Sequence, residues 1–306
     1  MAAYCLHNTS ALRLNNPTLS SFSCRPLLCQ VPRKIITMCR DQSSYCASIT
    51  AEIEAHLKQA IPLKPPLTVF EPMHHMTFSA PLNSAPALCV AACELIGGSR
   101  SQAMAAASAL YLMLAASVTH EKLHIPNRLK PKPKPAPGVC SANGPMFDLM
   151  FLDAMVPFGY ELLAISDDPD QDTSGRVLRV IVELARAMGS QGIIHAQYQG
   201  VIVSQLDGGG SNNIELIDDM CRKKEGRVHA CAAACGAILG GANEEEIEKL
   251  RKYGLYVGII QGYTNRLGRK VKEIERVVEL RNLALKELDH FKGQKVEEIS
   301  SFIVGP

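Results

Sequence analysis

The segment from Gln102 to Val118 limits the fold more than any other part of this sequence. It is built mainly from alanine, leucine, methionine and serine, and it contains neither glycine nor proline. Alanine and leucine favour helices, and a helix that is apolar on every side is normally buried. The segment therefore predicts a helix in the centre of a helical bundle.

Other segments predict helices that would surround this one. Their boundaries are residues 46–60, 87–97, 100–121, 147–165, 175–188, 214–239, 243–260 and 270–292. Pro157 is expected to interrupt the helix over 147–165, while Gly97–Gly98 and Gly240–Gly241 are expected to end helices. No stretch shows the alternation typical of a strand. The predicted fold is all-α, a single-domain bundle of roughly ten or more helices over residues 46–306.

The first forty residues differ in composition from the rest of the chain. They lack Asp and Glu, are rich in Ser, Thr and Asn, and have no long apolar run. Their five basic residues are Arg13, Arg25, Arg33, Lys34 and Arg40. This composition is typical of organelle transit peptides. Residues 1–45 are therefore predicted to be a disordered transit peptide that is cleaved, with a plain disordered tail as the alternative.

Charge and hydropathy exclude two classes of partner. The formal net charge is +2, which gives no electrostatic reason to expect binding to nucleic acid. No stretch approaches about 18 uninterrupted apolar residues, so no membrane span is predicted.

Two Cys-x-x-x-Cys motifs, Cys89–Cys93 and Cys231–Cys235, lie within predicted helices. A spacing of four places both sulfur atoms on one face of a helix. The small residues between them make that face smooth, so that another helix can approach closely. A metal site that includes His229, a redox pair and a buried apolar face are the alternatives. The residues alone favour the buried face, because free cysteine is commonly a core residue.

Three segments resemble the plant geranylgeranyl diphosphate synthase family. They are LCVAACELIGGSRSQAMAAASAL at 88–110, LMFLDAMVPFGYELL at 149–163 and CGAILGGANEEEIEKLRKYGLYVGII at 235–260. The resemblance implies a helical bundle of the isoprenoid synthase type. Enzymes of this family join isopentenyl diphosphate to an allylic diphosphate. Their two Asp-rich motifs hold Mg²⁺ ions that stabilise the departing diphosphate.

Neither Asp-rich motif is intact in this chain. The positions of the first, DDxxxxD, fall on Glu121, Lys122 and Asn127. The positions of the second, DDxxD, fall on Asn265, Arg266 and Arg269. One carboxylate remains, and the arginines would repel a divalent cation. The resemblance therefore implies that this chain has no catalytic residue and binds no metal or other cofactor.

The other diphosphate-binding elements of the family are also altered. Residues 80–86, which correspond to the basic segment that binds isopentenyl diphosphate, contain no Lys or Arg. Gln197 and Lys224 are retained vestiges, although Gly200 and Glu225 replace the Asp and Thr that accompany them in the family. The basic loop that follows the second motif is largely missing.

This pattern resembles the non-catalytic small subunits of plant heterodimeric geranyl(geranyl) diphosphate synthases. In that subfamily the Cys-x-x-x-Cys helices are implicated in pairing, so Cys89, Cys93, Cys231 and Cys235 are expected to contribute to partner interaction. The implied partner is a geranylgeranyl diphosphate synthase large subunit of the plastid stroma, in a heterodimer or heterotetramer. Mg²⁺ is expected to bind that catalytic partner.

The leading hypothesis is a regulatory pseudoenzyme of isoprenoid and terpenoid biosynthesis. It would shift the product of the large subunit towards ten-carbon geranyl diphosphate, or change its activity. Two alternatives remain open. The chain could be a diverged prenyl diphosphate synthase that acts alone, or a module that binds an apolar ligand.

Overall fold

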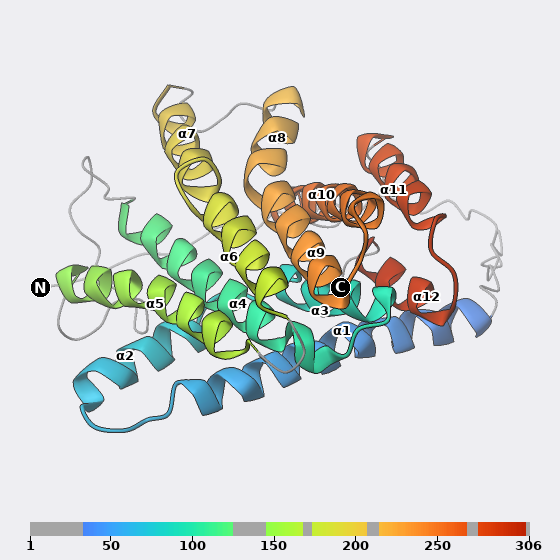
Figure 1. Cartoon of the computed structure of the whole chain (residues 1–306). Helices are drawn as coiled ribbons and strands as arrows, with labels where there is room; N and C mark the ends of the chain where they lie inside the picture. The colour runs from blue at the N-terminus through green and yellow to red at the C-terminus, as the bar shows by residue number, and fades with distance from the viewer. Residues whose placement is uncertain (1–32, 125–144, 168–172, 207–213, 268–274, 304–306) are drawn as a thin grey trace, which may run out of the picture.

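A computed structural model describes residues 33–124, 145–167, 173–206, 214–267 and 275–303 of the chain (Figure 1). Within these ranges the chain is helical and has no strand, which confirms the all-α prediction. The α-helices are α1 Arg33–Ala60, α2 Leu67–Phe78, α3 Ala85–Ile96, α4 Arg100–His124, α5 Pro145–Ile165, α6 Ser174–Met188, α7 Ile193–Leu206, α8 Ile214–Cys221, α9 Arg227–Gly240, α10 Glu244–Leu267, α11 Glu275–Leu288 and α12 Gln294–Ser300. A π-helical turn, Arg222–Gly226, joins α8 to α9, and a 3-10 turn, Ser301–Ile303, follows α12.

Most of the predicted helices are present, and several differ in their bounds. The helix predicted from residue 46 begins at Arg33 in the structure. α5 continues through Pro157, because its packing along α4 outweighs the one hydrogen bond that proline cannot donate. The predicted helix over 214–239 is divided by the π-helical turn.

The end of the chain and two further helices also depart from the prediction. The last predicted helix corresponds to α11 and α12, and residues 268–274 lie outside the described residues. α2 and α7 were not predicted, since α2 contains Pro72 and neither helix has a clear amphipathic repeat. The expected helix stops are confirmed at Gly97 and Gly241, whose φ angles of 102° and 86° lie in the left-handed region.

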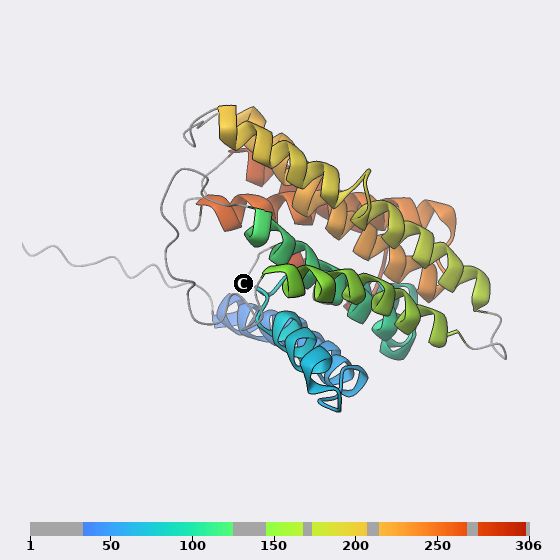
Figure 2. The same ribbon diagram turned by 90° about the vertical axis from the view of Figure 1, so that its left-hand side faces the viewer.

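The centre of the bundle is formed by α4 and α9. α4 packs against α3, α5 and α9, and α9 also packs against α6 and α10. α1 and α2 lie along one edge, beneath the remaining helices in Figures 1 and 2. The stretch Arg100–Glu121 of α4 is long and apolar enough to cross a membrane by length and composition alone, yet 78% of its apolar window is buried. Its position in the core accounts for that composition.

α10 approaches α9 and the π-helical turn through Gly254, Gly258 and Gly262, which lie four residues apart on one helix face. A Cβ atom at Gly254 would overlap the carbonyl oxygen of His229, and one at Gly258 would overlap the carbonyl oxygen of Glu225. Backbone therefore packs directly on backbone here. This contact fixes the π-helical turn, and with it the position of Lys224, relative to α10.

Candidate functional site

A cavity of about 190 Å³ lies where the segment before α3, the second half of α4, the π-helical turn and the end of α10 meet. Its described lining consists of Ala80, Pro81, Leu82, Asn83, Pro86, Tyr111, Leu114, Ala115, Ser117, Val118, Ile193, Lys224, Glu225, Val228 and Asn265. The lining includes positions from residues 80–86, from the Lys224 element and from the second Asp-rich motif. The structure therefore brings together three altered motifs that are far apart in the sequence.

Glu121, the acidic residue left in the first motif, lies near the end of α4. Its carboxylate accepts hydrogen bonds from Nζ of Lys224, at 2.9 Å to Oε1 and 2.6 Å to Oε2. The side chain of Lys122 and the whole of Asn127 lie outside the described residues. The acid left in the first motif and the retained Lys224 thus bind each other.

The second motif lies at the end of α10. Asn265 and Arg266 are both exposed, and Oδ1 of Asn265 accepts a hydrogen bond of 3.1 Å from Nε2 of Gln261. Arg269 lies outside the described residues. Neither described position offers a carboxylate to the cavity.

This donor set does not fit Mg²⁺, which requires oxygen ligands in near-octahedral geometry and is usually held by carboxylates. The described residues contain no group of three or more His, Cys, Asp or Glu side chains that could hold a metal ion. Both oxygens of Glu121 already bind an ammonium group. No metal-dependent step is assigned to these residues.

Gln197, the other retained residue, links two helices beside the cavity. Its Nε2 donates to the carbonyl oxygen of Ser117 at 2.9 Å and lies 2.8 Å from Oγ of the same residue. α7 is thereby held against α4. In this chain Gln197 and Lys224 both connect parts of the protein to one another.

The altered segment 80–86 is attached to α9 through a buried histidine. Nδ1 of His229 lies 2.8 Å from the carbonyl oxygen of Glu225, and because a carbonyl can only accept, Nδ1 carries the proton. Nε2 then accepts from the hydroxyl of Ser84 at 2.9 Å. Asn83 accepts the backbone N–H of Ala85 at 2.8 Å, at the start of α3. Burial lowers the pKa of His229 to about 4.

Acid is expected to destabilise the chain through His229. Its pKa is about 4 when folded and 6.5 in a model peptide, so between these values the unfolded chain binds the proton more readily. The contribution of His229 to stability should be constant above pH 6.5 and should fall by about 3 kcal/mol as the pH approaches 4. Urea unfolding across this pH range measures the loss. His229→Gln should remove most of the slope, whereas the contribution of His56, whose pKa burial also lowers, remains in both proteins. Equal slopes in the two proteins would contradict this assignment.

The burial of the Glu225 carboxyl group beside the cavity was not predicted from the sequence. Burial raises the pKa of its carboxyl group, and Oε2 has no hydrogen-bond partner among the described residues. The Ser84–His229 contact was also missed. Those two residues are 145 positions apart, and no local pattern signals such a contact.

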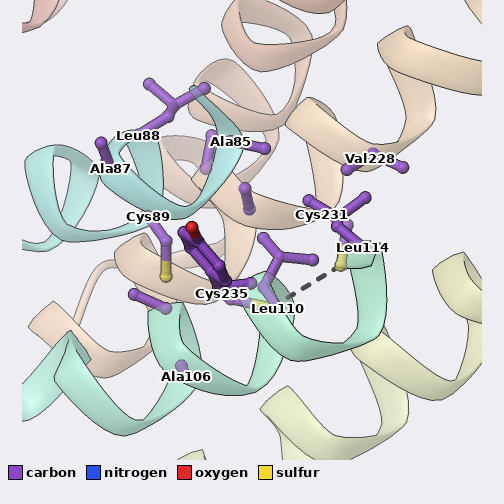
Figure 3. Packing of buried hydrophobic residues seen from close by; sticks show 14 of the residues in the cluster. Ala85, Ala87, Leu88, Cys89, Ala106, Leu110, Leu114, Val228, Cys231 and Cys235 are labelled. Atoms are coloured by element: carbon purple, nitrogen blue, oxygen red, sulfur yellow. Dashed lines mark hydrogen bonds between the residues drawn. The ribbon is translucent and has the colours of Figure 1, made fainter. Parts of the chain in front are cut away.

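The four motif cysteines lie in the core. Cys89 and Cys93 on α3 and Cys231 and Cys235 on α9 are each at most 3% exposed. Figure 3 shows Cys89, Cys231 and Cys235 in one packed cluster with Leu110 and Leu114 of α4. The buried apolar interpretation is confirmed for all four side chains.

The close helix approach predicted for these faces occurs within the chain, between α3 and α9. A Cβ atom at Gly236 of α9 would overlap the carbonyl oxygen of Cys89. Sγ of Cys231 and Sγ of Cys235 are 3.8 Å apart, and the described cysteines are free thiols. Burial raises the pKa of Cys89, and that of Cys93 to about 12, so both remain protonated at neutral pH. A role in partner interaction stays a prediction.

A second candidate surface lies on α5 and α6, which contact each other on the outside of the α4–α9 core. Four large apolar side chains are exposed there, and we call them the α5–α6 face. They are Met150 (60% exposed), Ile165 (72%), Leu178 (63%) and Val182 (38%). Leu178 and Val182 lie on the same side of α6, and exposed apolar side chains that group together commonly mark a site of protein–protein contact.

Comparisons with known proteins cover most of the chain. No family model matches it. It is 57% identical over 270 residues to a Cannabis sativa protein named heterodimeric geranylgeranyl pyrophosphate synthase small subunit 2, chloroplastic, with 87% of this chain and 92% of the relative covered. It is similar to the crystal structure of the geranyl diphosphate synthase small subunit from Antirrhinum majus, with a TM-score of 0.74, 47% identity, and 86% and 98% of the two chains covered. It also resembles a mint deletion mutant of heterotetrameric geranyl pyrophosphate synthase in complex with ligands, with a TM-score of 0.72, 45% identity, and 85% and 99% covered.

Proposed function

The chain belongs to the family of heterodimeric geranylgeranyl pyrophosphate synthase small subunits, and from that premise we propose that it is a regulatory subunit without catalytic activity of its own. The observation that carries the proposal is the ion pair between Glu121 and Lys224. It joins the remaining acid of the first motif to a retained cation, so neither is free for a metal or a diphosphate. The catalytic groups would come from a large subunit.

We propose that pairing changes the product of that large subunit. Docking of this chain would stabilise one arrangement of the partner's helices, which favours release of ten-carbon geranyl diphosphate or raises the rate. The mint structure is named as a heterotetrameric geranyl pyrophosphate synthase, which supports an assembly of this kind.

We propose that the partner binds the α5–α6 face. Leu178 and Val182 are four residues apart on α6, so their side chains lie on the same side of that helix. Their exposure in the single chain is explained if a second subunit covers them. The Cys-x-x-x-Cys motifs would then affect pairing indirectly, because they set the spacing between α3 and α9, and α6 packs against α9.

We propose that the chain acts in plastids and that its transit peptide ends before Tyr45. The relative from Cannabis sativa is named chloroplastic. Tyr45 donates a hydrogen bond of 2.6 Å to Glu94, and Arg100 and Lys295 lie over its ring at 5.6 and 5.7 Å from the centroid. These contacts favour a mature chain that retains Tyr45.

Co-expression with a plastid large subunit tests the proposed function. We expect the two chains to purify together and the products to differ from those of the large subunit alone, while this chain alone produces no allylic diphosphate with Mg²⁺. Condensation by the isolated chain would support the stand-alone synthase instead. Failure to co-purify, together with an unchanged product profile, would reject the regulatory role.

A further inference from the structure

We propose that the cavity beside the Glu121–Lys224 pair binds a small, uncharged, mainly apolar molecule and discriminates against the phosphorylated form of the same molecule. This inference goes beyond the regulatory role and does not depend on pairing. It assigns this chain a ligand preference opposite to that of a diphosphate site.

The size of the cavity sets the size of the ligand. Its volume is about 190 Å³. A dry apolar cavity of about 150 Å³ in another protein holds one benzene molecule of six carbon atoms. The cavity described here therefore suits a compact ligand of about six to ten non-hydrogen atoms. A branched five-carbon alcohol falls within that range.

The walls favour an apolar ligand. Leu114 and Ala115 of α4 and Val228 of α9 are buried side chains of the lining. Leu82, which is 72% exposed, and Pro86 line the cavity on the side of segment 80–86. Aliphatic carbon from three separate parts of the chain thus converges on one space, and the transfer of apolar surface into it from water is favourable.

The charges of the site disfavour a phosphate group. Lys224 is the only basic residue in the described lining, and both oxygens of Glu121 bind its ammonium group. A second acid, Glu225, also lines the cavity and brings no positive charge to it. A diphosphate would have to displace the carboxylate of Glu121 from Lys224 before it could pair with the ammonium group.

Three neutral polar residues of the lining have partners within the chain. The hydroxyl of Ser117 contacts Gln197 at 2.8 Å, and Oδ1 of Asn83 accepts the N–H of Ala85. Oδ1 of Asn265 accepts from Gln261. None of these interactions presents a cluster of donors to an anion.

A matched pair of probes tests the preference. The alcohol 3-methyl-3-buten-1-ol and its diphosphate share one hydrocarbon skeleton and differ in charge. Each is titrated into the full chain alone, without Mg²⁺, while the methyl NMR signals of Leu114, Val118 and Val228 are followed. We expect the alcohol to shift these signals with a Kd of about 1 mM, and the diphosphate to bind at least tenfold more weakly. Equal or tighter binding of the diphosphate, or no shift with either probe, would overturn the proposal.

Two variants separate the contributions of space and charge. Ala115→Leu fills the cavity and should weaken alcohol binding at least tenfold, whereas the exposed Ala164→Leu on α5 should leave it unchanged. Glu121→Gln frees the ammonium group of Lys224, so diphosphate binding should strengthen at least tenfold while alcohol binding stays the same. An unchanged preference in Glu121→Gln would refute the charge argument even if Ala115→Leu does not fold. Because every measurement uses this chain alone, the outcome is independent of whether it pairs with a large subunit.

Discussion

Replacement of Gly258 by alanine is expected to lower the free energy of unfolding by about 3 kcal/mol or more. The added Cβ would overlap the carbonyl oxygen of Glu225, and it would also lie 2.8 Å from Cα of Gly226. Both neighbours are backbone atoms of the π-helical turn, so no side-chain rotation can relieve the overlap. α10 must move away from the turn, and the buried contacts on both sides of Gly258 are weakened together.

Urea unfolding of the full chain, with circular dichroism at the helical band, measures this effect. Gly175→Ala is the matched control, because no heavy atom lies within 4 Å of the Cβ that it would add. That variant should change stability by no more than about 0.5 kcal/mol. If Gly258→Ala were as stable as Gly175→Ala, the backbone contact between α10 and the π-helical turn would be incorrect.

The fold was largely predictable because its helices are long and marked by clear signals. The uninterrupted run from Gln102 to Val118 could only be a buried helix, and it lies within α4. Gly97 and Gly241 end helices where predicted. α2 and α7 lacked comparable signals, and the three-glycine face of α10 was visible as a four-residue spacing but was not recognised.

The positions of the altered motifs were also predictable, whereas their contacts were not. The alignment of motif residues placed Glu121 and Lys224 separately, as a degenerate ligand and a retained vestige. Their ion pair joins residues 103 positions apart and depends on the π-helical turn that carries Lys224. Neither the pairing nor the turn has a local signature in the sequence.

The Cys-x-x-x-Cys motifs show how one pattern can support two interpretations. A smooth face formed by small residues predicts close approach by another helix, and the identity of that helix depends on the tertiary structure. In this chain the helices that approach are α3 and α9 themselves. Since all four thiols are buried, contact with a partner must involve other residues or a change in this packing.

Leu178→Glu is therefore expected to weaken binding to the large subunit at least a hundredfold. Leu178 is 63% exposed in the single chain, so a glutamate there remains solvated and should change the stability of the monomer by no more than about 0.5 kcal/mol. When a partner covers α6, the same carboxylate must lose its water without gaining a cation, which costs several kcal/mol. Surface-immobilised large subunit, with the dissociation constant measured for each variant, reports the loss.

Leu285→Glu on α11 is the matched control. Leu285 is 47% exposed, and α11 packs against α10 and α12 rather than against α5 or α6. This variant makes the same chemical change away from the α5–α6 face and should bind the large subunit as tightly as the original chain.

Cys231→Ser separates the direct and indirect roles of the motif, because it places a hydroxyl in the α3–α9 core. Its effect on pairing should follow its loss of stability, since Cys231 does not reach the surface. If Cys231→Ser abolished pairing at unchanged stability while Leu178→Glu had no effect, the α5–α6 face would not be the partner surface, and α3 and α9 would have to separate to admit the large subunit.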